Sequence, residues 1–315
     1  MRAAVIRRYG GPEVFAIEEV ATPRPGAKQL LIRMRGSSVN PVDCAIRQGM
    51  LRAFVRLKLP AVLGIDYAGV IEAVGSEVRD FSVGNEVFGF IDIRVCGAYG
   101  EYAVVDAASA ARKPPGLSWA EAGAAPGSGL TAHQALLSVI AARAGERLLV
   151  NGAGGGVGTF VVQIAKAIGC HVTAVGSGSK RELLRGLGAD VVIDYTQQDP
   201  FAAQAAYDGI VDCVGNIGVL TARRMLCTGG RFVAVASSPQ IMLRALFSKL
   251  LPGKPYRSMY VVPRGSDVEA LAGWFTRGQA RVVLDSTYPL ERIAEAHAQV
   301  ERGRSAGKVA VTIGP

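Results

Sequence analysis

A glycine-rich turn in the middle of the chain is the clearest chemical signal in the sequence. A β-like run at residues 148–151 leads into it, and a helical pattern of apolar residues follows. In such a turn, glycines let the backbone approach a pyrophosphate and let the helix pack closely, while the first N–H groups of the helix face the anion. The spacing is G-x-x-G-x-x-G rather than G-x-G-x-x-G, so the prediction depends on the strand and helix around it; a turn that only connects them is the alternative. The predicted dinucleotide-phosphate site consists of Gly152, Ala153, Gly154, Gly155, Gly156, Val157 and Gly158.

The end of the next β-like run indicates which dinucleotide binds. A protein specific for NADH places Asp or Glu there, about 20 residues after the glycines, to hold the ribose 2′-hydroxyl. Residues 175–181 contain no carboxylate. Gly176, Ser177, Lys180 and Arg181 offer instead the donors and cations that a 2′-phosphate requires, which predicts NADPH. The alternative is that Lys180 and Arg181 are ordinary first-turn helix residues, although cations there oppose the helix dipole.

The cysteines and histidines show no metal-binding or nucleophile motif. The cysteines are odd in number, lie far apart and include no Cys-x-x-Cys pair, which argues against a disulfide framework and a four-cysteine zinc site and favours a reducing compartment. His133 and His297 fall in helical patterns, where packing or surface roles are more frequent than ligation. The cysteines are Cys44, Cys96, Cys170, Cys213 and Cys227.

The elements that must position these residues change character near Ser118. Residues 1–117 are short β-like runs cut by Gly and Pro, which indicates a mainly β domain. Ser118 and Glu121 form a capping box at the start of an Ala-rich helix. Apolar runs then alternate with amphipathic helices, which predicts a doubly wound parallel sheet because parallel neighbours need crossover connections. The six predicted strands are 147–151, 171–175, 191–193, 210–213, 231–235 and 258–262.

The C-terminal segment returns to β character, so the fold class is α/β. Residues 281–288 and 308–313 are predicted strands, and an amphipathic helix between them ends at Gly303. In residues 240–255, apolar and basic residues alternate, and we predict that this segment is a helical lid over the cleft.

Composition and charge narrow the class of protein. With 315 residues, 50% of them apolar, the chain is long enough for two globular domains. The net charge is +9, but Lys and Arg form no run of five or six, which favours a phosphorylated small molecule over nucleic acid as the partner. The N-terminus carries charge too early for a signal peptide and no apolar run reaches about 18 residues, so we predict a cytoplasmic protein that makes no membrane contact.

Further motifs extend over nearly the whole chain. They are Val39-Asn-Pro-Val-Asp43 and the stretches 59–75, 83–88, 129–135, 187–195, 211–215 and 307–309. With these motifs and the glycine turn, the sequence resembles the medium-chain dehydrogenase/reductase superfamily, in particular its zinc-independent quinone oxidoreductase branch.

The resemblance implies two domains with the active site in the cleft between them. A GroES-like catalytic domain would comprise residues 1–117 and 265–315, and a Rossmann dinucleotide-binding domain with a six-stranded parallel sheet residues 118–264. Asn40, as an orienting donor, and Thr131 would lie near the nicotinamide, and Lys308 would approach the cleft. Local packing or capping is the alternative for each of these residues. The other implied cofactor contacts are Tyr195, Val214, Val235 and Ala236.

The resemblance also implies a reaction without a metal. Zinc-binding members carry Gly-His-Glu where this chain has Gly64-Ile-Asp66, and isoleucine cannot serve as one of the three protein ligands of a catalytic zinc. Without a Lewis acid, oxidation of a simple alcohol is disfavoured. We therefore predict hydride transfer from NADPH to an electron-poor acceptor, a quinone or an α,β-unsaturated carbonyl.

Substrate contacts and alternatives remain open at this point. Relatives often place a Tyr after the Asn-Pro-x-Asp motif, where this chain has Cys44; we predict Cys44, Tyr67 and Tyr99 as pocket residues, although aromatic residues near β runs belong more often to the core. An enoyl-thioester or enone reductase of the same fold is one alternative function, and a non-catalytic dinucleotide- or RNA-binding relative is another. Relatives also imply a homodimer joined through the edge strand near residues 258–262.

Overall fold

Both ends of the chain contribute to one folding unit, and the middle forms another. The computed structural model describes residues 1–235, 239–248 and 256–314. Unit 1 comprises Met1–Leu130, Val262–Arg277 and Val282–Pro315, and unit 2 comprises Thr131–Val261 and Gly278–Arg281. The first boundary therefore lies 13 residues beyond Leu117, at Leu130. The reason is that helix α2 (Trp119–Ala124) packs against strand β3 (Gln29–Val39), so closely that a Cβ on Gly123 would overlap the backbone of Gly36.

Unit 1 is built around a mostly antiparallel sheet. Its described strands run in the order β15-β16-β3-β5-β6-β8, with β7 also paired to β3, and a smaller sheet has the order β2-β1-β4. Long β3 lies between β16 and β5, so one strand joins the N-terminal and C-terminal parts of the unit. The strands are β1 (Arg2–Ile6), β2 (Phe15–Glu19), β3, β4 (Ala61–Val62), β5 (Asp66–Val74), β6 (Glu86–Phe90), β7 (Tyr102–Asp106), β8 (Ala110–Arg112), β15 (Leu284–Pro289) and β16 (Lys308–Thr312).

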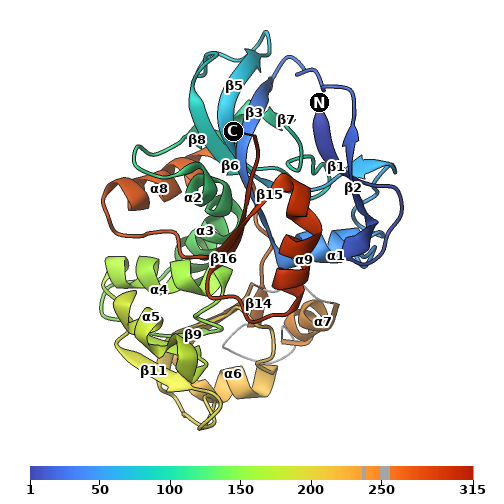
Figure 1. Ribbon diagram of the computed structural model, residues 1–315. Helices are drawn as coiled ribbons and strands as arrows, with labels where there is room; N and C mark the ends of the chain where they lie inside the picture. The colour runs from blue at the N-terminus through green and yellow to red at the C-terminus, as the bar shows by residue number, and fades with distance from the viewer. Residues whose placement is uncertain (236–238, 249–255, 315) are drawn as a thin grey trace. The chain divides into compact units, whose positions relative to one another are not determined.

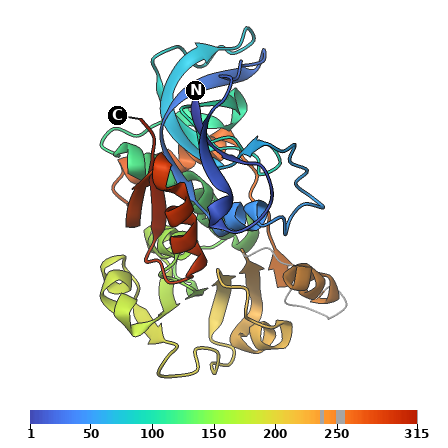
Figure 2. The ribbon, with the colours of Figure 1, turned by 45° about the vertical axis from the view of Figure 1, so that its right-hand side comes forward.

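The helices of unit 1 begin at caps that the sequence encodes. The capping box at α2 is confirmed, because the Ser118 hydroxyl accepts from the Glu121 N–H at 3.3 Å and Glu121 accepts from the Ser118 N–H at 2.9 Å. Asn40 caps α1, and Pro41 occupies its first position. Helix α9 lies beside β15 and β16 (Figure 2). The other helices are α1 (Pro41–Arg47), α8 (Gly265–Thr276), α9 (Ile293–Glu301) and α3 (Pro126–His133), whose last three residues belong to unit 2, with short 3₁₀ turns at Pro12–Val14, Ala107–Ser109 and Leu290–Arg292.

Unit 2 contains the parallel sheet that the sequence predicts. Every described strand pair in it is parallel, and the order is β11-β10-β9-β12-β13-β14. The direction of chain progression reverses between β9 and β12, which is the point where such sheets bind ligands beyond the carboxyl ends of their strands. The strands are β9 (Arg147–Asn151), β10 (His171–Gly176), β11 (Val191–Asp194), β12 (Tyr207–Asp212), β13 (Leu226–Ala234) and β14 (Tyr256–Ser258).

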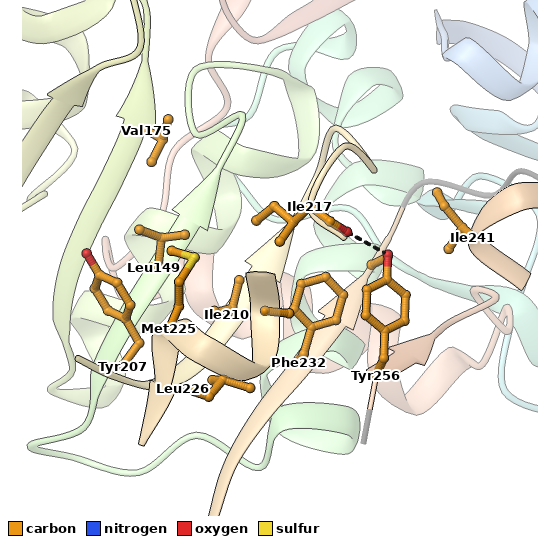
Figure 3. Close-up of a cluster of buried hydrophobic side chains, with 12 residues drawn as sticks. Leu149, Val175, Tyr207, Ile210, Ile217, Met225, Leu226, Phe232, Ile241 and Tyr256 are labelled. Carbon is orange, nitrogen blue, oxygen red and sulfur yellow. Dashed lines mark hydrogen bonds between the residues drawn. The ribbon is translucent and has the colours of Figure 1, made fainter. Parts of the chain in front are cut away.

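The edge strand differs from the prediction of 258–262. Strand β14 ends at Ser258, and Met259 and Tyr260 are outside it. The buried ring of Tyr256 stacks on Phe232 with centroids 4.1 Å apart, and its hydroxyl donates to the Ile217 carbonyl at 3.2 Å (Figure 3). This anchoring explains why pairing starts two residues earlier than the apolar run suggests.

Helices flank the sheet of unit 2 (Figure 1). Residues Gln134–Ile140 form a π-helical segment after α3. The first part of the predicted lid is helix α7, and residues 249–255 lie outside the described residues, as does Ala236. Across the described ranges, no helix has both the length and the apolar character needed to cross a bilayer. The helices are α4 (Gly156–Ile168), α5 (Arg181–Gly186), α6 (Val219–Met225) and α7 (Pro239–Ser248), with a 3₁₀ turn at Gly178–Lys180.

Candidate functional site

The glycine turn of unit 2 forms a backbone cradle at the start of α4. Gly152 has a φ of +71°, a conformation that favours glycine, and Gly155 donates its N–H to the Gly152 carbonyl at 3.1 Å. A Cβ on Gly158 would overlap the Gly152 carbonyl, so only glycine lets α4 pack this closely. Gly155 is the N-cap and supplies no side chain, and Gly156 and Val157 begin the first turn. A helix start without a side-chain cap is suited to an anion, because the first N–H groups of a helix have no partner within it.

Lys180 reaches this cradle from the end of the neighbouring strand. Its Nζ donates to the Gly154 carbonyl at 3.3 Å, and a Cβ on Gly154 would overlap the lysine Cδ. Ser177 lies on the same turn, with its Oγ 3.0 Å from the Ser179 Oγ, and Arg181 begins α5. The structure thus brings a cation from after β10 to the turn after β9, and it gives Gly154 a second role, which is to make room for the lysine stem.

The other predicted cofactor residues of unit 2 lie at the carboxyl ends of its strands. Val214 is 53% exposed, and its Cγ2 would lie 2.7 Å from a Cβ on Gly152. The buried carboxylate of Asp212 holds this loop by accepting the N–H groups of Val214 at 3.0 Å and Gly215 at 2.9 Å. Val235 donates its N–H to the Asp212 carbonyl at 3.0 Å.

Two further predicted contacts have different surroundings. Tyr195 follows β11 and is 57% exposed, with its N–H donated to the carbonyl of Gly176 at 3.3 Å. Thr131 is buried within α3. The structure adds a carboxylate that the sequence did not point to. Asp194, at the end of β11, accepts a hydrogen bond from the backbone N–H of Gly178.

In unit 1, a buried polar cluster forms where strands β3, β5 and β16 meet helices α1 and α3. Asn40 Nδ2 donates to Asp43 Oδ2 at 3.0 Å and to Asp66 Oδ2 at 2.9 Å, and Asn40 Oδ1 accepts from Lys308 Nζ at 2.5 Å. Lys308 also lies 3.5 Å from Asp66 Oδ2. Asp66 accepts further hydrogen bonds from the Ser38 hydroxyl at 2.5 Å and the Gly127 N–H at 2.6 Å. All four charged or amide side chains are buried, and they come from α1, its cap, β5 and β16.

Burial controls the charges of this cluster. It raises the pKa of Asp43 to about 7, and one oxygen of that carboxyl, Oδ1, is buried without a hydrogen-bond partner. Burial lowers the pKa of Lys308, while Asp66 and Asp43 favour its ammonium form. The cluster therefore holds an ion pair beside a carboxyl group that can carry a proton near neutral pH.

The amide of Asn40, which the sequence predicts as an orienting donor near the nicotinamide, is bonded within the cluster. Its amide has two N–H bonds, and both are directed to carboxylates. If the amide were flipped, its NH₂ group would face the Lys308 ammonium, and two donors would meet. The hydrogen bonds therefore define the amide orientation. Asn40 is both a helix cap and the residue that links Lys308 to the two carboxylates.

The three predicted pocket residues are buried in unit 1, as the core alternative expects, and their role in a substrate pocket stays a prediction. Tyr67 and Tyr99 are fully buried, and their hydroxyls donate to the carbonyls of Ser109 at 3.2 Å and Ser38 at 3.1 Å. Cys44 lies with its Sγ 3.4 Å from His297 Nδ1. Burial raises the pKa of the Cys44 thiol to about 12 and lowers that of His297 to about 3, so the pair is a neutral packing contact and not an activated nucleophile.

A GroES-like unit and a six-stranded parallel sheet with a glycine turn at a helix start are typical of nicotinamide-dependent oxidoreductases. Two family models match the chain, "Alcohol dehydrogenase GroES-like domain" over residues 26–115 and "Zinc-binding dehydrogenase" over residues 187–311. The chain is 31% identical over 322 residues to the chloroplastic quinone-oxidoreductase QR1 of Triphysaria versicolor, covering 99% of this chain and 98% of that protein.

Two further comparisons agree with this one. The chloroplastic NADPH-dependent alkenal/one oxidoreductase of Arabidopsis thaliana is 32% identical, with 99% of this chain and 79% of that protein covered. The solved quinone oxidoreductase of Coxiella burnetii superposes with a TM-score of 0.92 at 26% identity, covering 100% of this chain and 99% of that one. The chain belongs to the medium-chain dehydrogenase/reductase superfamily, in its quinone-oxidoreductase branch.

Proposed function

We propose that the protein is an NADPH-dependent reductase that transfers hydride, without zinc, to a quinone or an α,β-unsaturated carbonyl. The contact of Lys180 Nζ with the carbonyl of Gly154 is the observation that carries the cofactor assignment. It sets an ammonium group beside a cradle suited to a pyrophosphate, and Ser177 and Arg181 add a hydroxyl and a second cation from the same turn. Together they provide the donors that a 2′-phosphate needs.

The side chains around Asp66 do not fit a zinc ion, although one matching family model is described as a zinc-binding dehydrogenase. Its two carboxylate oxygens already accept from Ser38, Asn40 and the Gly127 N–H, and the Lys308 ammonium lies 3.5 Å away. The preceding residue, Ile65, offers no ligand. Catalytic zinc takes three ligands from Cys, His and carboxylate, and no such group of three occurs within the described ranges.

This arrangement favours an acceptor that is already electron-poor. Bound NADPH would supply the hydride, and the glycine turn with Lys180 would hold its phosphates. Lys308 and Asn40 form a fixed polar group on unit 1, and the resemblance places Asn40 near the nicotinamide and Lys308 near the cleft. Hydrogen-bond donors and cations can stabilise an enolate or a hydroquinone anion, whereas an unactivated alcohol needs a stronger electrophile.

The names of the relatives favour two substrate classes, quinones and alkenals or enones. The test is NADPH oxidation followed by absorbance with a quinone panel and an enone panel, alongside NADP⁺ reduction with unactivated primary alcohols. We expect turnover in at least one of the first two panels and none with the alcohols. Turnover of the alcohols alone would overturn the proposal, and no turnover together with salt-sensitive RNA retention would favour the non-catalytic alternative.

We further propose that the enzyme is a cytoplasmic homodimer. The described cysteines are all free, which is the state expected in a reducing compartment. Strand β14 is short and lies at the edge of its sheet, where backbone groups are open to pairing. Light scattering should give twice the chain mass of 33.0 kDa, and the mass of a single chain would reject the dimer.

A further inference from the structure

Asp194 is a buried carboxylate close to the proposed 2′-phosphate site. It is the last residue of β11, and the parallel register pairs it with Gly176, the last residue of β10. The carboxyl ends of the two strands therefore meet, and the N–H of Tyr195 bonds to the carbonyl of Gly176. Asp194 is only 7% exposed. A carboxylate repels a nearby phosphate, so its position beside a phosphate site is unfavourable unless the carboxylate has another role.

The carboxylate of Asp194 accepts hydrogen bonds from neighbouring residues of the chain. Its Oδ1 accepts from the Thr196 N–H at 3.0 Å and from the Thr196 hydroxyl at 2.7 Å. The backbone N–H of Gly178 also bonds to it, and a Cβ on Gly178 would overlap Oδ2. The Thr196 hydroxyl is the main reason that the pKa of Asp194 lies below its ordinary value, followed by the backbone donors, so the carboxylate is ionised at neutral pH.

These bonds reach the turn that carries Lys180. Gly178 begins the 3₁₀ turn Gly178–Lys180, and Lys180 closes it by donating its N–H to the Ser177 carbonyl at 2.9 Å. A three-residue turn has few bonds of its own, so an outside acceptor at Gly178 limits where the backbone of Lys180 can lie. The side chain of Lys180 then extends over Gly154.

We propose that Asp194 and Thr196 are positioning residues for NADPH, which hold the turn Gly178–Lys180 so that Lys180 and Ser177 face the 2′-phosphate. This inference rests on the proposed NADPH specificity. Asp194 does not hold a ribose hydroxyl, as the carboxylate of an NADH-specific site does, because its donors come from Thr196 and Gly178. Thr196 occupies Oδ1 of the carboxylate with two of its donors.

The test measures dissociation constants of NADPH and NADH by calorimetry for Asp194→Asn and Thr196→Val, together with KM and kcat. An amide cannot replace the carboxylate toward all three donors, so Asp194→Asn should weaken NADPH about tenfold and NADH less than twofold. Thr196→Val removes only the hydroxyl and should weaken NADPH about threefold. Because neither residue contacts the reacting atoms, kcat at saturating NADPH should not change.

Matched controls separate positioning from charge and folding. Asp199→Asn removes the same charge from the same loop region and should leave both constants unchanged, because within the described ranges its carboxylate accepts only the Phe201 N–H. Gly178→Ala should weaken NADPH because its Cβ meets Asp194, whereas Gly186→Ala, where a Cβ would meet nothing within 4 Å, should not.

Three results would decide against the inference. Tighter NADPH binding by Asp194→Asn would show that the carboxylate acts by repulsion, and equal losses for both cofactors would show a general structural role. Unchanged NADPH binding in both Asp194→Asn and Thr196→Val would show that the turn needs no outside support. Failure of the proposed cofactor is distinguishable, since the unmodified protein would then bind NADH as tightly as NADPH before any variant is measured.

Discussion

The glycine turn of unit 2 and the polar cluster of unit 1 are assembled in opposite ways. The turn uses backbone groups of one contiguous stretch, Gly152–Gly158, and needs only glycine and a strand and helix on either side. The cluster uses side chains that are far apart in the sequence, since Asn40 and Lys308 are separated by 268 positions. A backbone site is therefore sensitive to added atoms, whereas the cluster is sensitive to the removal of any charge that balances the others.

The largest effect is expected from Lys308→Met. The change leaves Asp66 buried with its remaining donors but without a countercharge, which should lower the free energy of unfolding by about 3–5 kcal/mol in urea denaturation. Lys28→Met is the control, because Lys28 is exposed and its Nζ lies 3.7 Å from the Glu77 carboxylate. This change should lower the free energy of unfolding by less than about 1 kcal/mol. A loss as small as that of the control would mean that the buried pair contributes no net stability.

A smaller but still large effect is expected in unit 2 from Gly158→Val. The added side chain would overlap the Gly152 carbonyl and the Ala153 backbone, so the turn and α4 must move apart. NADPH affinity should fall by about 100-fold, or about 2.7 kcal/mol, in calorimetry. Gly186→Val serves as the control on a helix of the same unit, and an equal loss of affinity there would contradict the account of the cradle.

The cofactor assignment predicts a more selective change. Lys180→Ala combined with Ser177→Ala should weaken NADPH about 30-fold while NADH changes little, because only NADPH carries the 2′-phosphate. Fluorescence titration of both cofactors measures this ratio. Equal losses for the two would assign Lys180 to the pyrophosphate, next to the Gly154 carbonyl.

The smallest expected effect is a pH dependence of unit 1 in which two buried groups oppose each other. Asp43, with a pKa of about 7, keeps a proton that the unfolded chain has lost, so its contribution to stability declines as pH rises from about 4 to 7. His297, with a pKa of about 3, stays neutral where the unfolded chain is protonated, so its contribution declines as pH falls through the same range.

Removing one of these two groups should make the pH dependence contributed by the other visible. In urea denaturation between pH 4.5 and 6.5, Asp43→Asn should make the free energy of unfolding rise with pH, by about 1 kcal/mol per unit more than in the unmodified protein. His297→Phe, which retains the aromatic packing against Phe15 and Tyr99, should make it fall. Parallel pH profiles for the unmodified protein and both variants would show that neither group titrates as assigned.

The same contrast explains how much could be predicted from the sequence. The parallel sheet, the capping box at Ser118 and the glycine turn follow local patterns, and the structure shows all three. The cluster depends on β3 pairing with both β5 and β16, which no local pattern specifies. Asn40 and Lys308 were identified only by resemblance, and their direct contact was not anticipated.

Other differences have equally physical causes. For Tyr67 and Tyr99, the sequence does not separate a pocket from a core, because an aromatic residue near a strand looks the same in both. Asp194 was not predicted as a site residue, because the sequence does not show that its carboxylate bonds to the turn after β10, although adjacent parallel strands end side by side. Strand register, more than residue type, was the missing information in both units.

The most direct test of the account is quinone or enone reduction by protein dialysed against a zinc chelator, with the metal content of the same sample measured by mass spectrometry. The donors around Asp66 predict full NADPH-dependent turnover at well below one zinc per chain, and no gain when zinc is added back. Loss of turnover on dialysis and its return with stoichiometric zinc would contradict the account.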